Sequence, residues 1–243
     1  MKRLCLFLLL FFTTGVFADM KPGDFYTRGS TSAKKIALTF DDGPGPYTDQ
    51  FLALLDKYQV KATFFVLGEL VQYKPASIKE IVAKGHELAD HTYNHTNYKN
   101  RYKEILAGMK EKGLGEKEAI AAVKGEVLAS MRKSKAQIEK YSGVKPVFCR
   151  MPHGVDRPWI SEAARENGYV LINWTYGADW NAGTAEELLP GYLKAINPGA
   201  IFLFHDGGRG RAKSLVITEA VIKAALEQGY EIIPVGQLLS SKN

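Results

Sequence analysis

Short apolar runs alternate with longer segments of helical periodicity along most of the chain. The apolar runs predict strands at 35–40, 62–66, 87–89, 147–150, 170–173, 200–204 and 231–233. The segments between them predict helices at 47–58, 77–84, 98–112, 117–141, 157–167, 185–196 and 215–228. Several of these helices end in glycine, as helix C-termini prefer: Gly85, Gly143, Gly168 and Gly229. Strands and helices that alternate in this way are typical of parallel βαβ units, so the pattern predicts an α/β fold.

The first residues follow a different pattern, that of a cleavable secretion signal. Lys2 and Arg3 precede an apolar run at 4–12, and a small-residue cleavage site ends at Ala18. A membrane anchor is the alternative, but the run is well short of the ~20 apolar residues that a spanning helix needs. No cysteine lies beside the cleavage site to carry a lipid. We expect cleavage after Ala18 and a secreted or periplasmic product with no stable membrane anchor.

Length and composition narrow the possible domain organisation and binding partners of the chain that remains after the signal. After a signal at 1–18, a short segment at 19–34 precedes one domain at 35–243, a size typical of a single α/β barrel. Loss of Lys2 and Arg3 leaves 30 basic against 26 acidic residues, a net charge of +4. So small and dispersed an excess argues against nucleic-acid binding. Cys149 has no cysteine partner once Cys5 is removed, and its place in an apolar strand predicts a buried filler.

Polar residues that can carry chemistry follow several of the predicted strands. The segment Asp41-Asp42-Gly43-Pro44 follows the first strand, His91 and His95 follow the third, Arg150 ends the fourth, and His205 follows the sixth. In a parallel barrel the loops at the C-terminal strand ends converge, and active sites lie there. The positions of these residues therefore predict one common site.

A metal centre is the chemistry that these residue types favour. Two histidines four residues apart can face one point in a helical or turn conformation, and two histidines with one carboxylate form a common catalytic zinc set. A pair of surface histidines is the alternative. Of the adjacent aspartates, one can ligate the metal while Asp41 accepts a proton from the attacking water, and Arg150 is suited to orient that carboxylate.

Together, in this order, the motifs resemble the polysaccharide deacetylases of carbohydrate esterase family 4, over roughly 35–239. The resemblance implies a distorted, incomplete (β/α)7 barrel with parallel strands. It also implies a role for each matching residue. Asp42, His91 and His95 are the metal ligands, Asp41 is the base, His205 is the acid that protonates the leaving amine, and Leu203 borders the acetyl pocket.

Two motifs depart from the family pattern. His153 stands where family members usually have tyrosine, and its backbone N–H is expected to hold the oxyanion whatever its side chain. Asp179-Trp180 resembles the motif whose aspartate tunes the acid histidine and whose tryptophan lines the pocket. Its spacing from Trp174 is one residue short, and Gly177 replaces an earlier aspartate. We expect Asp179 to pair with His205, Trp180 to lie in the groove or core, and Trp159 and Trp174 to be core residues.

The resemblance implies a secreted, metal-dependent enzyme that removes N-acetyl groups from amino sugars in a polysaccharide. Zinc suits the ligand set best, and cobalt or nickel would also fit. Peptidoglycan is the expected glycan, with chitin oligomers close behind. An acetylxylan esterase and a non-catalytic glycan-binding protein are the alternatives. The region 99–142 is longer than its family counterpart and predicts either a solvated helical hairpin or a wall of the substrate groove.

Overall fold

The computed structural model describes residues 20–240 of the chain. The expected signal at 1–18 therefore lies outside the described residues. Within 20–240, no helix combines the length and the apolar character that crossing a membrane requires.

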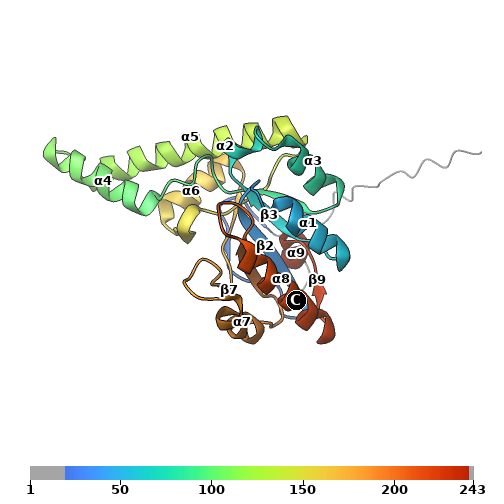
Figure 1. Ribbon diagram of the computed structural model, residues 1–243. Helices are drawn as coiled ribbons and strands as arrows, with labels where there is room; N and C mark the ends of the chain where they lie inside the picture. Colours follow the sequence, from blue (N-terminus) through green and yellow to red (C-terminus); the bar gives the residue numbers. More distant parts are fainter. Residues whose placement is uncertain (1–19, 241–243) are drawn as a thin grey trace, which may run out of the picture.

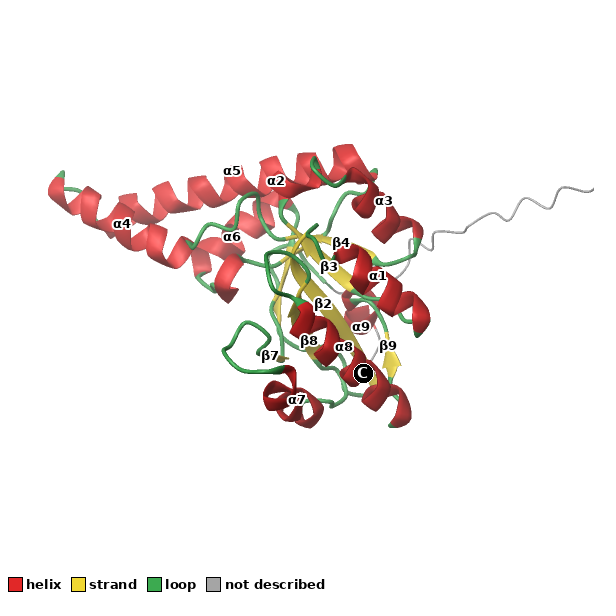
Figure 2. Cartoon of the chain, in the orientation of Figure 1, coloured by secondary structure: helices red, strands yellow, loops and turns green. Residues whose placement is uncertain are grey.

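A parallel sheet forms the centre of the molecule. Its strands run in the order β1-β6-β5-β4-β3-β2-β8-β7, with β9 also pairing with β2, and all of these pairings are parallel. The sheet curls into an incomplete barrel surrounded by helices (Figure 2), which confirms the predicted fold class. The strands are β1 (Phe25–Tyr26), β2 (Lys35–Gly43), β3 (Thr63–Val66), β4 (Glu87–Asp90), β5 (Phe148–Cys149), β6 (Val170–Ile172), β7 (Tyr176–Gly177), β8 (Ile201–His205) and β9 (Glu231–Ile232).

The helices agree with the predicted pattern apart from short additions. They are α1 (Thr48–Lys57), α2 (Gly68–Val71), α3 (Pro75–Ala83), α4 (Tyr98–Glu111), α5 (Glu116–Ser142), α6 (Pro158–Asn167), α7 (Ala185–Lys194), α8 (Ala212–Glu227) and α9 (Val235–Ser240), with a 3-10 turn at Pro152–Gly154. The prediction missed α2, α9 and the edge strands β1 and β7. Each is too short to show a helical or strand period in the sequence.

Alternation along β2 decides which residues face the barrel interior. Ile36, Leu38 and Phe40 are fully buried on the face that packs against α1 and α8. The ring of Phe40 lies 5.0 Å from that of Phe64 and 4.7 Å from that of Phe51. The intervening residues, Ala37, Thr39 and Asp41, point to the opposite face, because successive strand side chains alternate. The apolar pattern of β2 thus directs Asp41 into the barrel.

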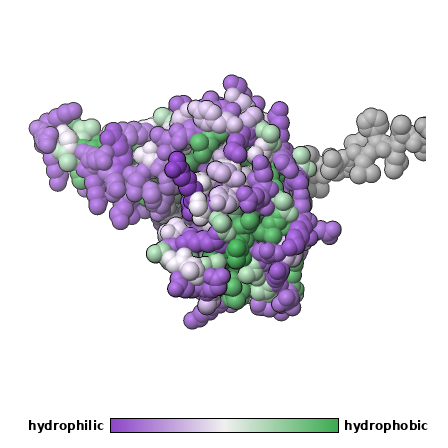
Figure 3. Space-filling view, viewed as in Figure 1, coloured by the Kyte–Doolittle hydropathy of each residue, from purple (hydrophilic) through white to green (hydrophobic). Residues whose placement is uncertain are grey.

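Helices α4 and α5 form a hairpin that projects from the barrel as an arm (Figure 1). On the face seen in Figure 3, the part of this hairpin (residues 98–142) that projects from the barrel is mostly hydrophilic. The part of α5 that lies against the barrel, called here the base of the arm, is anchored by buried side chains. These include Val127 and Met131, which pack with Trp159 and Cys149. Cys149 and Trp159 are therefore core residues, as predicted.

Candidate active site

A cavity of about 420 Å³ opens where the C-terminal ends of β2, β4 and β8 meet. Most of the predicted site residues line it, and Arg150 and Asp179 lie directly behind it. None of the described lining residues comes from the arm, so the hairpin forms no wall of this cavity. The lining is Asp41, Asp42, His91, His95, Met151, His153, Trp174, Trp180, Leu203, His205 and Arg211.

A bulge at the end of β2 brings both aspartates to the same cavity. In a regular strand, adjacent side chains would point to opposite faces. The register of β2 with β3 shifts between Asp41 and Gly43, and Asp42 adopts a left-handed φ of 69°. An extra residue of this kind redirects the side chain next to it. Consequently Asp41 and Asp42 can act together despite being neighbours in sequence.

Asp42, His91 and His95 converge on one point. The nitrogen Nε2 of His91 lies 3.5 Å from Asp42 Oδ1, and Nε2 of His95 lies 3.3 Å from the same oxygen. One ligand atom from each of the three residues falls within 4.8 Å of the others. The two histidines lie on a loop after β4 and not on a helix, and His95 has a left-handed φ of 55°. The four-residue spacing therefore brings the two imidazoles together through a strained turn and not through a helix.

The donor set suits a divalent cation. Nδ1 of His91 lies 2.8 Å from the carbonyl oxygen of Arg150, so this nitrogen donates and Nε2 is left as the ligand atom. Burial lowers the pKa of His91 to about 3, which keeps the imidazole neutral. Asp42 Oδ1 is buried without a hydrogen-bond donor. A bound cation would satisfy that oxygen, and two imidazoles with a carboxylate are ligands that zinc favours.

Asp41 is held by a fully buried arginine. Arg150 Nη1 donates to Asp41 Oδ1 at 2.6 Å and to Thr39 Oγ1 at 2.8 Å. The guanidinium carbon lies 4.1 Å from the ring centre of Phe65. Burial raises the pKa of Asp41, and the charge of Arg150 offsets this only in part. Asp41 is therefore a stronger base than an exposed aspartate, with one oxygen fixed by Arg150.

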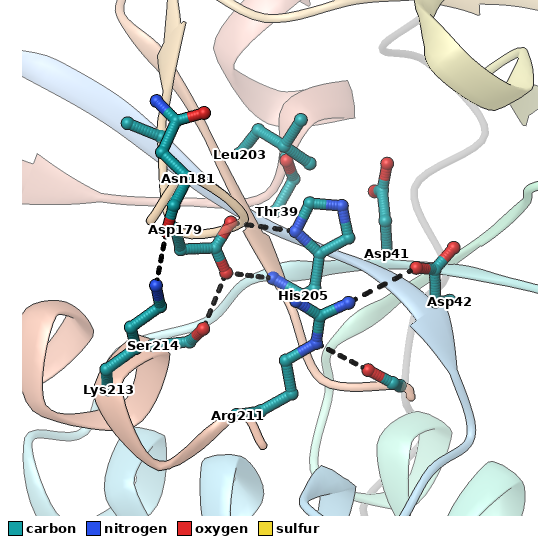
Figure 4. Close-up of polar contacts among 12 residues, drawn as sticks. Thr39, Asp41, Asp42, Asp179, Asn181, Leu203, His205, Arg211, Lys213 and Ser214 are labelled. Atoms are coloured by element: carbon teal, nitrogen blue, oxygen red, sulfur yellow. Dashed lines mark hydrogen bonds and ion pairs between the residues drawn. The ribbon is translucent and has the colours of Figure 1, made fainter. Parts of the chain in front are cut away.

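His205 and Asp179 form the second polar pair. Nδ1 of His205 lies 2.8 Å from Asp179 Oδ1, and the His205 backbone N–H donates to Oδ2 at 2.9 Å. Burial by itself lowers the pKa of His205, but the hydrogen bond and charge of Asp179 outweigh it and the net pKa is raised. In Figure 4 the His205 imidazole has Asp179 on one side and the aspartates of β2 on the other. Asp41 and His205 are also register partners on adjacent strands, so a base and an acid face one cavity.

The remaining predicted residues lie around the mouth of the cavity. Leu203 lines it, and Trp180 is 47% exposed with its ring 5.5 Å from that of His205. The His153 ring lies 4.8 Å from that of His95. The core assignment of Trp174 was wrong, because this side chain is only half-buried and lines the cavity. Gly177 has no room for a side chain, since a Cβ there would lie 2.8 Å from Leu203 Cβ.

Sequence reasoning missed two charged residues next to the site. Arg211 lines the cavity, with Nη2 3.7 Å from Asp42 Oδ2, and its Nε donates to the Gly207 carbonyl at 2.7 Å. Asp206 is fully buried, and the Thr48 hydroxyl donates to its Oδ2. Asp206 directly follows His205, but no local pattern indicates that it contacts α1. Arg211 directly precedes α8 and shows no spacing that would link it to β2.

The comparison with family models decides the identity of this arrangement. The model of the family described as polysaccharide deacetylase matches residues 28–172, more than half of the chain. This chain belongs to the polysaccharide deacetylase family. The matched segment contains the bulged aspartates, the histidine pair and Arg150. It ends before Asp179 and His205, whose places in the site come from the structure.

Known polysaccharide deacetylases resemble the chain over most of its length. A peptidoglycan-N-acetylglucosamine deacetylase of Bacillus cereus is 32% identical, covering 93% of this chain and 98% of that protein. A chitooligosaccharide deacetylase of Bradyrhizobium sp. is 30% identical, covering 86% and 92%. Among solved structures, a carbohydrate esterase family 4 pseudoenzyme from Bacillus anthracis superposes with a TM-score of 0.74 at 27% identity, covering 91% of this chain and 70% of the other. The fold thus occurs in relatives with and without activity, and function has to be argued from the site.

Proposed function

We propose that this polysaccharide deacetylase is a metal-dependent N-deacetylase of acetylated amino sugars in the bacterial envelope, with peptidoglycan N-acetylglucosamine as its substrate. One observation carries the proposal. A buried base held by Arg150, a histidine held by Asp179, and the Asp42–His91–His95 cluster all face one cavity of about 420 Å³. Hydrolysis of an unactivated amide needs both a base and an acid, and this cavity provides both.

The contacts of these residues, together with the resemblance to the family, support the following roles. Asp42, His91 and His95 would hold a divalent cation, which would supply Lewis-acid polarisation of the acetamide carbonyl. Asp41 accepts a proton from the water that attacks the carbonyl carbon. The resemblance to the family assigns the backbone N–H of His153, a residue that lines the cavity, to the developing oxyanion. Because Nδ1 of His205 is bonded to Asp179, Nε2 delivers the proton to the amide nitrogen as the C–N bond breaks. Acetate and a free amino sugar are released.

The choice of peptidoglycan is supported by the Bacillus cereus relative, whose match spans nearly the whole of both chains. The Bradyrhizobium relative favours chitin oligomers as the second candidate. Export at the predicted site after Ala18 is part of the same proposal, because peptidoglycan lies outside the cytoplasmic membrane. An N-terminus at Asp19 in protein recovered from the culture medium or periplasm tests that step.

The decisive experiment is acetate release from purified peptidoglycan, chitin oligomers and acetylxylan, measured side by side. We expect the greatest turnover on peptidoglycan. Turnover of acetylxylan alone would show an esterase, and no release from any of them would show a pseudoenzyme. Zinc content should be one ion per chain and should be lost in the His91→Ala/His95→Ala double variant. Full zinc occupancy in that variant would refute the metal assignment.

A further inference from the structure

The loop that carries both histidine ligands is held from outside the barrel, by the base of the arm. We define this histidine loop as residues 91–95, directly after β4. Ser134 and Ser130 lie one turn apart on α5, on the side that faces the loop. The Tyr93 N–H donates to Ser130 Oγ at 3.1 Å. The single hydroxyl proton of Ser134 is shared between Asp90 Oδ1, at 2.6 Å from Oγ, and the Thr92 carbonyl oxygen, at 3.1 Å.

Asp90 connects these contacts to the first ligand. It is fully buried and directly precedes His91. Its Oδ1 also accepts the Thr92 N–H at 2.7 Å, and its Oδ2 accepts the hydroxyl of Tyr169. The Asp90 side chain therefore fixes the peptide that follows His91. Without Ser134, a buried carboxylate oxygen would lose one of its two donors, which is costly.

The loop needs such support because of its backbone. Thr92 has a φ of 68° and His95 a φ of 55°, a region that side chains other than glycine rarely adopt. Strained conformations of this kind persist only where surrounding contacts over-determine them. Further contacts surround the loop: Gly68 N–H donates to the Thr92 carbonyl oxygen at 3.0 Å, and the Lys133 ammonium lies 3.7 Å from the ring centre of Tyr93.

Helix α5 packs against the start of α2, next to the histidine loop, with no free space. A Cβ on Gly68 would lie 2.5 Å from Ser134 Oγ and 2.6 Å from Ser134 Cα. Ser134 is itself fully buried. The hydroxyl is therefore confined between Gly68, Asp90 and Thr92, and cannot move away from the loop without moving the helix.

We propose that Ser134 and Ser130 are positioning residues for the metal centre: they hold the histidine loop in the strained conformation that directs both Nε2 atoms towards Asp42. The inference rests on the proposed metal site. In this proposal the arm contributes to the active site by holding the histidine loop and not by lining the cavity. The base of α5 belongs to the support of the active site, although no residue of the arm touches the cavity.

The test compares Ser134→Ala and Ser130→Ala with a control on the same helix. The control is Ser142→Ala, whose hydroxyl donates to the Ile138 carbonyl at 2.6 Å and accepts the Val144 N–H at 2.9 Å, away from the loop. The dissociation constant for Zn²⁺ is measured by chelator competition, and the visible spectrum of the Co²⁺ form reports ligand geometry. Loss of contacts that orient ligands weakens binding by about 10- to 100-fold. We expect this for Ser134→Ala, a smaller loss for Ser130→Ala, and wild-type affinity for Ser142→Ala.

A second measurement separates this inference from the proposed function. Amide hydrogen exchange of the metal-free protein should be faster at residues 91–95 in the two loop variants and unchanged in the control. Equal zinc affinity, an unaltered Co²⁺ spectrum and unaltered exchange would overturn the positioning role. If Ser134→Ala does not fold, the same measurements on Ser130→Ala, at a half-buried position, test the positioning role. A wild-type protein that binds no zinc would refute the metal site, while the exchange rates would still decide whether α5 holds the loop.

Discussion

Asp41 and Asp42 are adjacent carboxylates that the fold directs to different partners. Asp41 contacts Arg150, and Asp42 faces the two histidines. We expect Asp41→Asn to keep the bound zinc but to lose about 10²- to 10⁴-fold in turnover, because the attacking water loses its proton acceptor. Asp42→Asn should weaken zinc binding first. Elemental analysis together with acetate release distinguishes the two variants, and the opposite pattern would exchange the two roles.

The pKa of His205 should set the alkaline limb of the pH–rate profile. Its pKa is raised in the folded protein, so it remains protonated somewhat above its reference value of ~6.5. An acid must be protonated to act, and therefore amide hydrolysis should decline as the pH rises through this raised value. In His205→Ala this alkaline limb should disappear, with a loss of about 10²- to 10⁴-fold on the amide substrate.

An activated aryl acetate serves as the internal control for His205, because its phenolate leaves without a proton. We expect His205→Ala to retain far more of its activity on this ester than on the amide. Equal losses on both substrates would show that His205 supports the structure of the site instead of protonating the leaving group.

At the scale of elements, the turn after β8 crosses the end of β2 with almost no space between the two backbones. A Cβ on Gly207 would lie 1.8 Å from the Asp42 carbonyl oxygen. Gly207→Ala should therefore displace the bulge, weaken zinc binding and reduce the free energy of unfolding by about 1–3 kcal/mol, as overpacking does. Urea unfolding and chelator competition measure the two effects.

Gly108 in α4 provides a matched control for Gly207. No atom lies within 4 Å of the position that its Cβ would occupy. Gly108→Ala should leave zinc binding unchanged and stabilise the protein by up to about 1 kcal/mol, the difference in helix propensity. If the Gly207→Ala protein had the stability and zinc affinity of the wild type, the close approach of the Gly207 turn to the Asp42 backbone would be contradicted.

At the scale of the whole molecule, buried carboxylates make stability depend on pH. Burial raises the pKa of Asp206 to about 7, and the Thr48 hydroxyl offsets this only in part. The folded state thus binds this proton more tightly than the unfolded chain, whose aspartate has a pKa of ~3.9. Its contribution to stability is present at low pH and is lost as the pH rises from about 4 towards 7.

In the metal-free protein, Asp206→Asn should therefore make the slope of stability against pH less negative than in the wild type. Urea unfolding between pH 4 and pH 7 measures the slope. Other buried groups contribute to the remaining slope: burial raises the pKa of Asp90 to about 6, which lowers stability as the pH rises, and lowers that of His91 to about 3, which has the opposite effect. An Asp206→Asn protein with the wild-type slope would show that Asp206 is ionised throughout this range.

Local patterns in the sequence were enough to predict a parallel α/β sheet, the succession of most strands and helices along the chain, and one common location for Asp41, Asp42, His91, His95 and His205. The individual roles of these residues came from the resemblance to the family. Apolar alternation and helical spacing are local properties, and strand ends in a parallel barrel converge whatever their distance along the chain. The two-residue strands β1 and β7 escaped prediction because no apolar run surrounds them, whereas the equally short β5 and β9 lie within apolar runs.

Contacts between distant segments were decided only by the tertiary structure. The bulge that turns Asp42 towards the histidines depends on pairing with β3, and the support of the histidine loop comes from serines on α5. Arg211 and Trp174 reach the cavity from loops with no motif of their own. The physical reason is common to all of them. A side chain acquires its role from neighbours that packing supplies, and residues forty or more positions apart, such as Asp90 and Ser134, share no local period that would reveal the contact.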